Sequence, residues 1–210
     1  MSAAQTLQRQ FREFQKNPLP GFNVELKEDN IFVWDIGIFG PPDTIYEGGY
    51  FRATMEFPED YPFNPPTFTF NTEFFHPNVY TDGRLCISIL HPPTPDPMSG
   101  ERPEERWNPT QSVESILISV ISLLTDPNVS SPANVDAGVM YRNDREQYNK
   151  IVREEVERSK KDIPENVTIP KSAEDFIIKN QPEPEDDESF WYDDVDVDEE
   201  WDEDDYMSDE

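Results

Sequence analysis

Cys86, the one cysteine of the chain, is the residue best suited to covalent chemistry. It lies in the segment HPNVYTDGRLCISIL, residues 76–90. The thiolate is the competent nucleophile, and a free thiol with a pKa of ~8.5 already ionises by a few per cent at neutral pH, so no neighbouring histidine base is obligatory. Because Leu85 and Ile87 flank it, the same thiol could also be a small buried hydrophobe. Chemistry and packing are therefore both open at this position.

The residues give less support to peptidase, disulfide, metal or nucleotide chemistry. A cysteine peptidase needs a base and a group that orients it, and the only histidines, His76 and His91, each directly precede a proline. We expect His76 to brace its loop, because the following proline restricts its backbone. A single cysteine excludes an internal disulfide and a cysteine-rich zinc site and fits a reducing compartment. With no GxxxxGKS/T loop and no metal cluster in the sequence, no cofactor is expected.

The elements that must position Cys86 change character along the chain. Residues 3–16 carry apolar side chains at helical spacing and predict an amphipathic helix that ends at Asn17-Pro18. Residues 22–70 contain short β-branched and aromatic runs separated by turns, which predict an antiparallel meander. Residues 71–109 keep neither period and are expected to form a long shaped loop region that contains Cys86.

Helices are expected after the loop region. Thr110 is predicted to cap a helix whose wide apolar stripe belongs to the core. The stripe consists of Val113, Ile116, Leu117, Val120, Ile121 and Leu124. Two further helices are expected in NVDAGVMYR and DREQYNKIVREEVERSKK, the second with Tyr148, Ile151, Val152 and Val156 as its buried edge. Helix, sheet, loops and then helices predict an α+β fold.

Charge divides the chain into three parts. We expect a catalytic domain over 1–161, a linker with a short helix over 162–182, and a disordered acidic tail over 183–210, which holds 17 of the 45 acidic residues and no Lys or Arg. A formal net charge of −28 disfavours nucleic acid and anionic membranes as partners and favours a basic protein. The N-terminus lacks the apolar core of a secretory signal, and no apolar stretch approaches the ~18 residues of a membrane span. The sequence thus predicts an intracellular protein, in the cytoplasm or nucleus.

Several motifs follow one another in a fixed order. They are Tyr61-Pro62-Phe63-Asn64-Pro65-Pro66, His76-Pro77-Asn78, Gly83 three residues before Cys86, Trp107-Asn108-Pro109 and Asp126-Pro127-Asn128. In this order the chain resembles the ubiquitin-conjugating enzymes, which implies a four-stranded antiparallel sheet flanked by helices. The resemblance implies that Cys86 accepts ubiquitin from the activating enzyme as a thioester and passes it to a lysine, while the activating enzyme consumes the ATP.

The resemblance also assigns roles to polar residues near Cys86. The Asn78 amide could donate to the oxyanion that forms when a lysine attacks the thioester. It could instead, or in addition, be a turn residue that bonds its own loop backbone. Ser88 and Ser131 stand where simpler members of the family often carry Asp, so other acidic or polar groups should position the incoming lysine ammonium and help its proton to leave.

An enlarged loop, HPPTPDPMSGERPEER, separates Cys86 from Trp107. It supplies the carboxylates of Asp96, Glu101, Glu104 and Glu105. We hypothesise that these carboxylates replace the missing ones and orient an acceptor ubiquitin, which would favour chain building; the alternative is a solvated surface insertion. Together with the acidic tail, this loop narrows the resemblance to the branch that serves cullin–RING ligases in cell-cycle control and proteasomal degradation.

That branch implies two contacts with the ligase. The RING subunit would bind an apolar patch formed by two loops and the first helix, made of Pro62, Phe63, Pro109, Thr110, Arg9 and Arg12. The first helix would also meet the activating enzyme. The tail would dock on a basic cullin surface, with aromatic anchors at Phe190, Trp191, Tyr192, Trp201 and Tyr206. The alternatives are a satellite core contact for Phe63 and a purely solvated tail.

Two other classes of protein remain as rivals. A catalytically silent ubiquitin-binding relative would be expected to lack the cysteine, yet Cys86 and Asn78 are both present. An acidic interaction protein would explain the tail but not the surroundings of Cys86. A covalent, reductant-sensitive ubiquitin adduct on Cys86 separates these classes.

Overall fold

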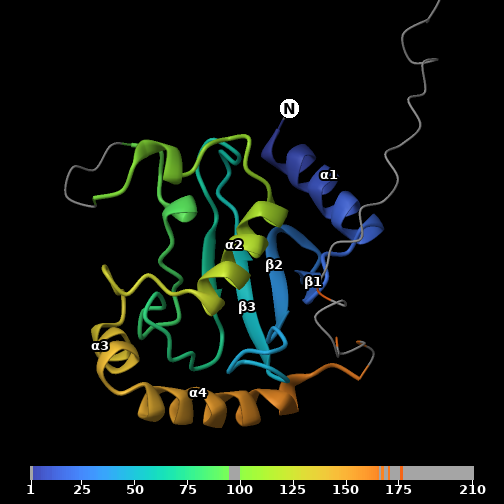
Figure 1. The fold of residues 1–210 in the computed structure, drawn as a ribbon. Helices are drawn as coiled ribbons and strands as arrows, with labels where there is room; N and C mark the ends of the chain where they lie inside the picture. Colours follow the sequence, from blue (N-terminus) through green and yellow to red (C-terminus); the bar gives the residue numbers. More distant parts are fainter. Residues whose placement is uncertain (1, 95–99, 166, 168–169, 171–175, 177–210) are drawn as a thin grey trace, which may run out of the picture. The chain divides into compact units, whose positions relative to one another are not determined.

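The computed structural model describes residues 2–94, 100–165, 167, 170 and 176 (Figure 1). The elements are α1 (Ala3–Lys16), β1 (Phe22–Lys27), β2 (Asn30–Phe39), β3 (Tyr50–Glu56), β4 (Thr67–Phe70), the 3-10 helices η1 (Ser88–Leu90) and η2 (Pro103–Glu105), α2 (Val113–Thr125), α3 (Val135–Asn143), α4 (Arg145–Ser159) and η3 (Lys160–Asp162). Helix, sheet, loops and helices follow one another as predicted, which confirms the α+β fold.

The sheet is an antiparallel meander with strand order β1-β2-β3-β4. Its register places Ile36 of β2 between Val24 of β1 and Ala53 of β3. Ile36 and Ala53 are buried and apolar, whereas the residues that alternate with them include the polar side chains of half-buried Asp35 and exposed Arg52. This period of two gives the sheet one apolar face for the helices to cover.

Helix α2 lies in front of the sheet in Figure 1 and supplies the other half of the core. Of the predicted stripe, Ile121 is half-buried and the remaining residues are buried. Those buried residues are Val113, Ile116, Leu117, Val120 and Leu124. The apolar stripe therefore belongs to the core, as its helical spacing predicted.

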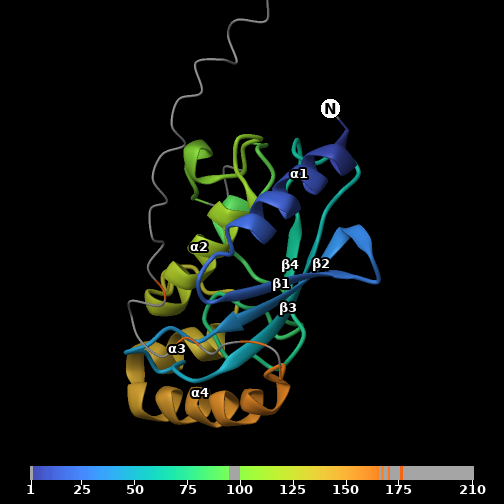
Figure 2. The ribbon, with the colours of Figure 1, turned by 90° about the vertical axis from the view of Figure 1, so that its right-hand side faces the viewer.

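The outer helices lie at opposite ends of the sheet, α1 at one end and α3 with α4 at the other (Figures 1 and 2). Helix α1 begins in a capping box in which Ser2 and Gln5 bond each other's backbone N–H groups. Phe11 packs edge-on against Trp34 of β2, with ring centroids 5.1 Å apart. Arg9 and Arg12 are exposed on the same helix, so its apolar face meets the sheet and its basic residues meet solvent.

The predicted cap at Thr110 is wrong, because α2 begins at Val113 and is capped by Ser112. The Ser112 side chain accepts from the Ser115 backbone N–H at 3.3 Å, and the Ser115 side chain accepts from the Ser112 N–H at 3.0 Å. The backbone N–H and the hydroxyl of Thr110 instead donate to the Asn108 side chain. The asparagine thus forms its own turn with Thr110, and the helix cap lies two residues later than predicted.

Glu155 is a buried carboxylate on the inner face of α4. It accepts a hydrogen bond from the Phe75 backbone N–H at 2.9 Å, and Arg158 lies 4.0 Å from it. Burial raises the pKa of Glu155 to about 7, although the Phe75 N–H and Arg158 oppose the shift. The folded protein therefore holds the Glu155 proton more tightly than the unfolded chain does.

We expect Glu155→Gln to stabilise the protein at pH 8 and to leave its stability nearly unchanged at pH 5. The contribution of Glu155 is fully present below its ordinary pKa of 4.5 and is lost as pH rises through about 7. The amide keeps an acceptor for Phe75 and has no charge to bury, so the gain in the free energy of unfolding should reach about 1–3 kcal/mol by pH 8. Urea titrations at pH 5, 6, 7 and 8 measure it, with Glu157→Gln as an exposed control on the same helix. A gain that is equal at all four pH values contradicts the assignment.

Some expectations concern residues outside the described part of the chain. Asp96, most of the predicted linker over 162–182 and the whole tail over 183–210 are among these, so the three-part division stays a prediction. Among the helices formed by the described residues, none is both long and apolar enough to span a membrane. Within the same residues, no group of three or more His, Cys, Asp or Glu side chains could hold a metal ion.

Candidate active site

Cys86 lies half-buried beside the edge of the sheet, where the chain returns from a hairpin. Its backbone N–H donates to the Asn78 carbonyl at 2.9 Å. The neighbouring Leu85 forms an antiparallel bridge with Val79 and donates its N–H to the carbonyl of Phe68 in β4 at 2.9 Å. Backbone hydrogen bonds on both sides thus fix the position of the thiol relative to β4 and to Asn78.

The turn before Cys86 requires a glycine. Gly83 has a φ of +89°, and a Cβ at this position would lie 2.3 Å from the Phe70 carbonyl oxygen. The Gly83 N–H closes the turn on the Tyr80 carbonyl at 2.9 Å. The turn brings the Tyr80 hydroxyl to 3.7 Å from the Cys86 Sγ, and this contact with the thiol is the main cause that raises the pKa of Tyr80.

His76 braces the loop, as predicted. Its ring is fully buried, Nδ1 accepts from the Asn78 backbone N–H at 3.0 Å, and Nε2 donates to the Leu123 carbonyl at 3.1 Å. Burial lowers the pKa of His76 to about 4, so the ring is neutral near pH 7. Both ring nitrogens are occupied by structural bonds, and this histidine is not the base of the site.

The Asn78 side chain joins two loops that are distant in sequence. Its Nδ2 donates to the Asn128 carbonyl at 2.9 Å, and its Oδ1 accepts from the Asn128 N–H at 2.8 Å. The side chain therefore bonds the backbone of the loop after α2. The turn interpretation assumed instead a bond to the backbone of its own loop. The amide nitrogen carries two hydrogens and the Asn128 carbonyl receives one of them, so the oxyanion role stays a prediction.

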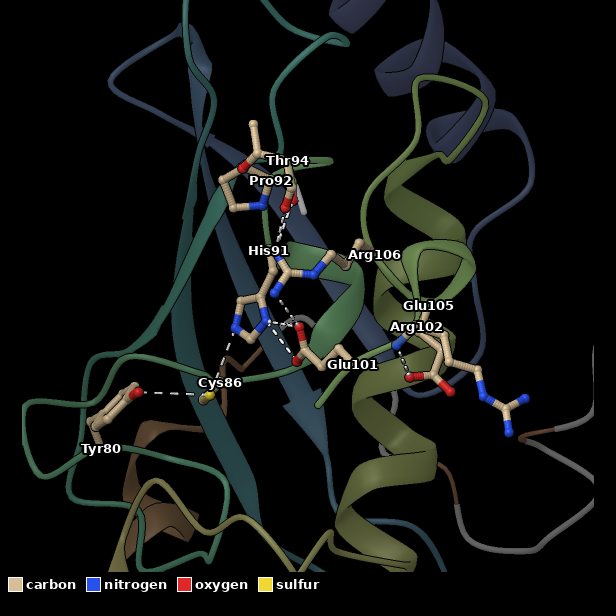
Figure 3. Close-up of polar contacts among 9 residues, drawn as sticks. All are labelled: Tyr80, Cys86, His91, Pro92, Thr94, Glu101, Arg102, Glu105 and Arg106. Carbon is tan, nitrogen blue, oxygen red and sulfur yellow. Dashed lines mark hydrogen bonds and ion pairs between the residues drawn. The ribbon is translucent and has the colours of Figure 1, made fainter. Parts of the chain in front are cut away.

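The second histidine, His91, lies next to the thiol, a contact that was not predicted from the sequence. The Nε2 of His91 is 3.7 Å from the Cys86 Sγ (Figure 3). On the other side of the ring, Nδ1 lies 2.7 and 2.9 Å from the two carboxylate oxygens of Glu101. A proline follows His91, but proline restricts the backbone before it and leaves the imidazole free to turn. The spacing of five residues from Cys86 was the signal available in the sequence.

Arg106 holds the ends of the loop around this histidine. It is buried, and its Nη2 lies 3.0 Å from the Glu101 carboxylate (Figure 3). Its Nη1 donates to the carbonyls of Pro92 and Thr94 at 3.2 and 2.9 Å. The guanidinium thus ties both described arms of the enlarged loop to the carboxylate that contacts His91.

The other predicted residues of the site lie on η1, on η2 and in the loop after α2. Ser88 begins η1, and its carbonyl accepts from the His91 N–H at 2.9 Å. Ser131 is exposed in the loop between α2 and α3. Glu104 is exposed, and the Glu105 carboxylate accepts from the Arg102 N–H at 3.2 Å. Among the described acidic residues of the loop, Glu101 is the one that hydrogen bonds connect with Cys86.

The residues of the predicted ligase patch come from α1 and from two loops that hydrogen bonds join to it. Gln10 of α1 accepts from the Tyr61 hydroxyl at 3.0 Å and from the Val113 N–H at 3.3 Å. The Trp107 indole donates to the Pro62 carbonyl at 2.8 Å. These bonds bring α1, the loop 61–66 and the loop before α2 together. Phe63 is 70% exposed, so the interpretation of it as a satellite core contact is wrong.

A meander sheet that presents one half-buried thiol beside an amide, a tyrosine and a histidine is suited to carry an acyl group on cysteine. The chain belongs to the ubiquitin-conjugating enzymes, because the family model described as ubiquitin-conjugating enzyme matches residues 6–156. It is thus a transferase of ubiquitin conjugation. The three rival interpretations, a catalytically silent ubiquitin-binding relative, a cysteine peptidase and an acidic interaction protein, are set aside. Ubiquitin, an activating enzyme and a ligase are the partners of this class.

Curated relatives agree with this assignment. The chain is 52% identical over 208 residues to ubiquitin-conjugating enzyme E2-34 kDa of Saccharomyces cerevisiae, an alignment that covers 94% of this chain and 70% of the relative. It is 52% identical over 158 residues to ubiquitin-conjugating enzyme E2 14 of Arabidopsis thaliana, covering 75% of this chain and 95% of the relative. Ubiquitin-conjugating enzyme E2 15 of Schizosaccharomyces pombe is 52% identical over 159 residues, with coverage of 75% and 95%.

Proposed function

We propose that the protein carries ubiquitin as a thioester on Cys86 and, with a cullin–RING ligase, builds ubiquitin chains that direct proteins to proteasomal degradation. The activating enzyme loads Cys86, and lysines of substrates or of ubiquitin receive the acyl group. The protein itself needs no cofactor for this reaction and would act in the cytoplasm, the nucleus or both.

The enlarged loop beside Cys86 is the observation that carries the chain-building part of this proposal. Its Glu101 carboxylate is held by His91 and Arg106 on the side of the thiol. A carboxylate fixed there would attract the ammonium of an incoming lysine. By the resemblance, Asp residues would have this role in simpler members of the family. Glu104 and Glu105 are exposed and would orient an acceptor ubiquitin, a role also assigned to Asp96. Ser88 and Ser131 would complete the polar surroundings.

The cullin part of the proposal rests on charge. The 17 acidic residues of 183–210 would give a fast, salt-sensitive encounter with a basic groove. Aromatic anchors between these charges would supply specificity. The alignment with the Saccharomyces cerevisiae relative covers 94% of this chain, whereas the two other relatives named above align with 75%. The C-terminal region is thus a feature of some members of the family.

The RING part of the proposal rests on the exposed patch at the α1 end. Phe63 stands exposed between half-buried Pro62 and exposed Asn64, while Pro109 and Thr110 are exposed on the adjoining loop. An aromatic side chain at 70% exposure has little to gain from the protein's own core and suits an anchor for a partner. Arg9 and Arg12 would form the charged rim of this contact.

Two truncations in parallel test the proposal. Removal of the tail after Gln181 should leave Cys86 charging unchanged, lower the cullin–RING-dependent rate about tenfold at low salt and flatten its salt dependence. Deletion of the enlarged loop should lower ligase-free synthesis of di-ubiquitin from the charged enzyme by about tenfold or more. Single-turnover discharge with purified ligase, across a series of NaCl concentrations, measures both effects.

Matched variants separate charge from anchoring. Replacing the five tail aromatics with alanine keeps every acidic residue, so this variant should retain the salt dependence and lose affinity for the ligase. A tail-truncated enzyme with the wild-type ligase-dependent rate and salt slope contradicts the cullin assignment. Unchanged di-ubiquitin synthesis after loop deletion contradicts the chain-building role.

A further inference from the structure

The imidazole of His91 lies between a nucleophile and a carboxylate, an arrangement that fixes the direction of its lone pair. Because Nδ1 faces both oxygens of Glu101 at 2.7 and 2.9 Å, the proton of a neutral ring belongs on Nδ1. The lone pair of Nε2 then faces the Cys86 Sγ at 3.7 Å, a distance suited to a hydrogen bond with sulfur (Figure 3). Nε2 is thus able to accept the thiol proton.

The backbone on which His91 sits is fixed from both sides. Its N–H donates to the Ser88 carbonyl at 2.9 Å, and its carbonyl accepts from the N–H of buried Trp107 at 3.0 Å. Arg106, only 6% exposed, fixes the carboxylate of Glu101 at 3.0 Å. The imidazole is therefore positioned before any partner binds, which reduces the reorganisation needed for proton transfer.

We propose that His91 is the proton acceptor and donor of the Cys86 thiol, with Glu101 as the residue that orients it. This role concerns every thioester step at Cys86 and does not depend on the cullin–RING assignment above. In this role His91 transfers a proton, which a residue that only braced the loop or only contacted an acceptor ubiquitin would not do.

During charging, the Sγ–H proton passes to Nε2 of His91 and the Cys86 thiolate attacks the thioester carbonyl of ubiquitin on the activating enzyme. A new C–S bond forms at Cys86, the C–S bond to the activating enzyme's cysteine breaks, and that departing thiolate takes up the proton. During discharge, His91 receives a proton from the attacking lysine nitrogen and returns it to the Cys86 thiolate as the C–S bond breaks. Glu101 stabilises the imidazolium in both directions.

Charged groups around the pair shape the expected pH dependence. Glu101 and, behind it, Arg106 face His91 from the enlarged loop. From the hairpin, Tyr80 faces the thiol at 3.7 Å. Behind Tyr80, the Arg84 guanidinium lies 5.2 Å from the ring centroid and pairs with Asp82 at 2.8 Å. Of these groups, His91 and Tyr80 contact the Cys86 sulfur directly.

The test compares the reactivity of Cys86 in wild type, His91→Gln and Glu101→Gln between pH 5.5 and 9. Alkylation of the free enzyme by iodoacetamide measures the thiol alone, and single-turnover charging from the loaded activating enzyme measures the same thiol in its reaction. We expect His91→Gln to slow both about tenfold or more at pH 7 and to approach wild type at the alkaline end of the range, where hydroxide replaces the imidazole as proton acceptor. Glu101→Gln should show a smaller loss of the same shape.

Controls separate proton transfer from structure. Glu154→Gln removes an exposed carboxylate on α4, outside the site, and should follow the wild-type profile. If His91→Gln loses its fold by circular dichroism, the Glu101→Gln profile decides alone. Wild-type profiles in the folded variants overturn the proposal, and so does a loss of equal size at every pH, which marks a merely structural role. Because alkylation needs neither ubiquitin nor ligase, failure of the proposed function leaves this test intact.

Discussion

Cys86→Ala should abolish the covalent ubiquitin adduct, because alanine has no nucleophilic atom to form the thioester. Cys86→Ser should still form an adduct, more slowly, since a hydroxyl ionises far less readily than a thiol. That adduct is an oxygen ester, so it should survive thiol reductant and break in hydroxide. Loss with alanine and altered chemistry with serine together assign the bond to this one side chain.

The measurement is a non-reducing gel beside a reduced one, after incubation with activating enzyme, ATP and ubiquitin. Wild type should give an ATP-dependent band one ubiquitin heavier that disappears with reductant. A reductant-sensitive band in Cys86→Ala contradicts the assignment. Charging with a ubiquitin-like modifier but not with ubiquitin would keep the mechanism and change the substrate.

Asn78→Ala should lower lysine discharge about 100-fold while charging proceeds at a near-normal rate. One well-aimed donor to the oxyanion contributes ~3 kcal/mol to the transition state. The same change removes both bonds to the Asn128 backbone, so the free energy of unfolding should also fall by about 2 kcal/mol. Discharge of the thioester to free lysine, measured with charging and urea unfolding on the same samples, separates the two effects.

Two variants distinguish the chemical from the structural part of the Asn78 effect. Asn78→Asp keeps an acceptor for the Asn128 N–H and lacks the donor, so discharge should fall as in the alanine variant. Asn128→Ala keeps the backbone groups that Asn78 bonds and should leave discharge unchanged. Discharge at the wild-type rate in Asn78→Ala would falsify the oxyanion role.

Element order was predictable because regular patterns carry it. The alternation around Ile36 specifies a strand with one buried face, and the spacing of Ile116, Leu117 and Val120 specifies a buried helix. The beginning of α2 was not predictable from propensity alone, because Thr110 and Ser112 are both good caps. The choice depends on Asn108, whose side chain holds Thr110 in a turn.

The site was predictable as far as single residues with distinctive chemistry, such as Cys86. Pairs that form across loops were not. The bond from Asn78 to Asn128 joins positions 50 residues apart, and no local pattern specifies it. The contact between His91 and Glu101 depends on how the enlarged loop folds back, for which helical and strand periods give no signal.

The backbone hydrogen bond from the Trp107 N–H to the His91 carbonyl closes the enlarged loop at its base. Because it joins the two ends of the enlarged loop at 3.0 Å, residues 92–106 leave and re-enter the scaffold at nearly one point. Loops closed in this way tolerate changes in length at small entropic cost. The length of the loop can therefore change while the thiol and His91 stay in place, provided that the Glu101 contact with His91 is kept.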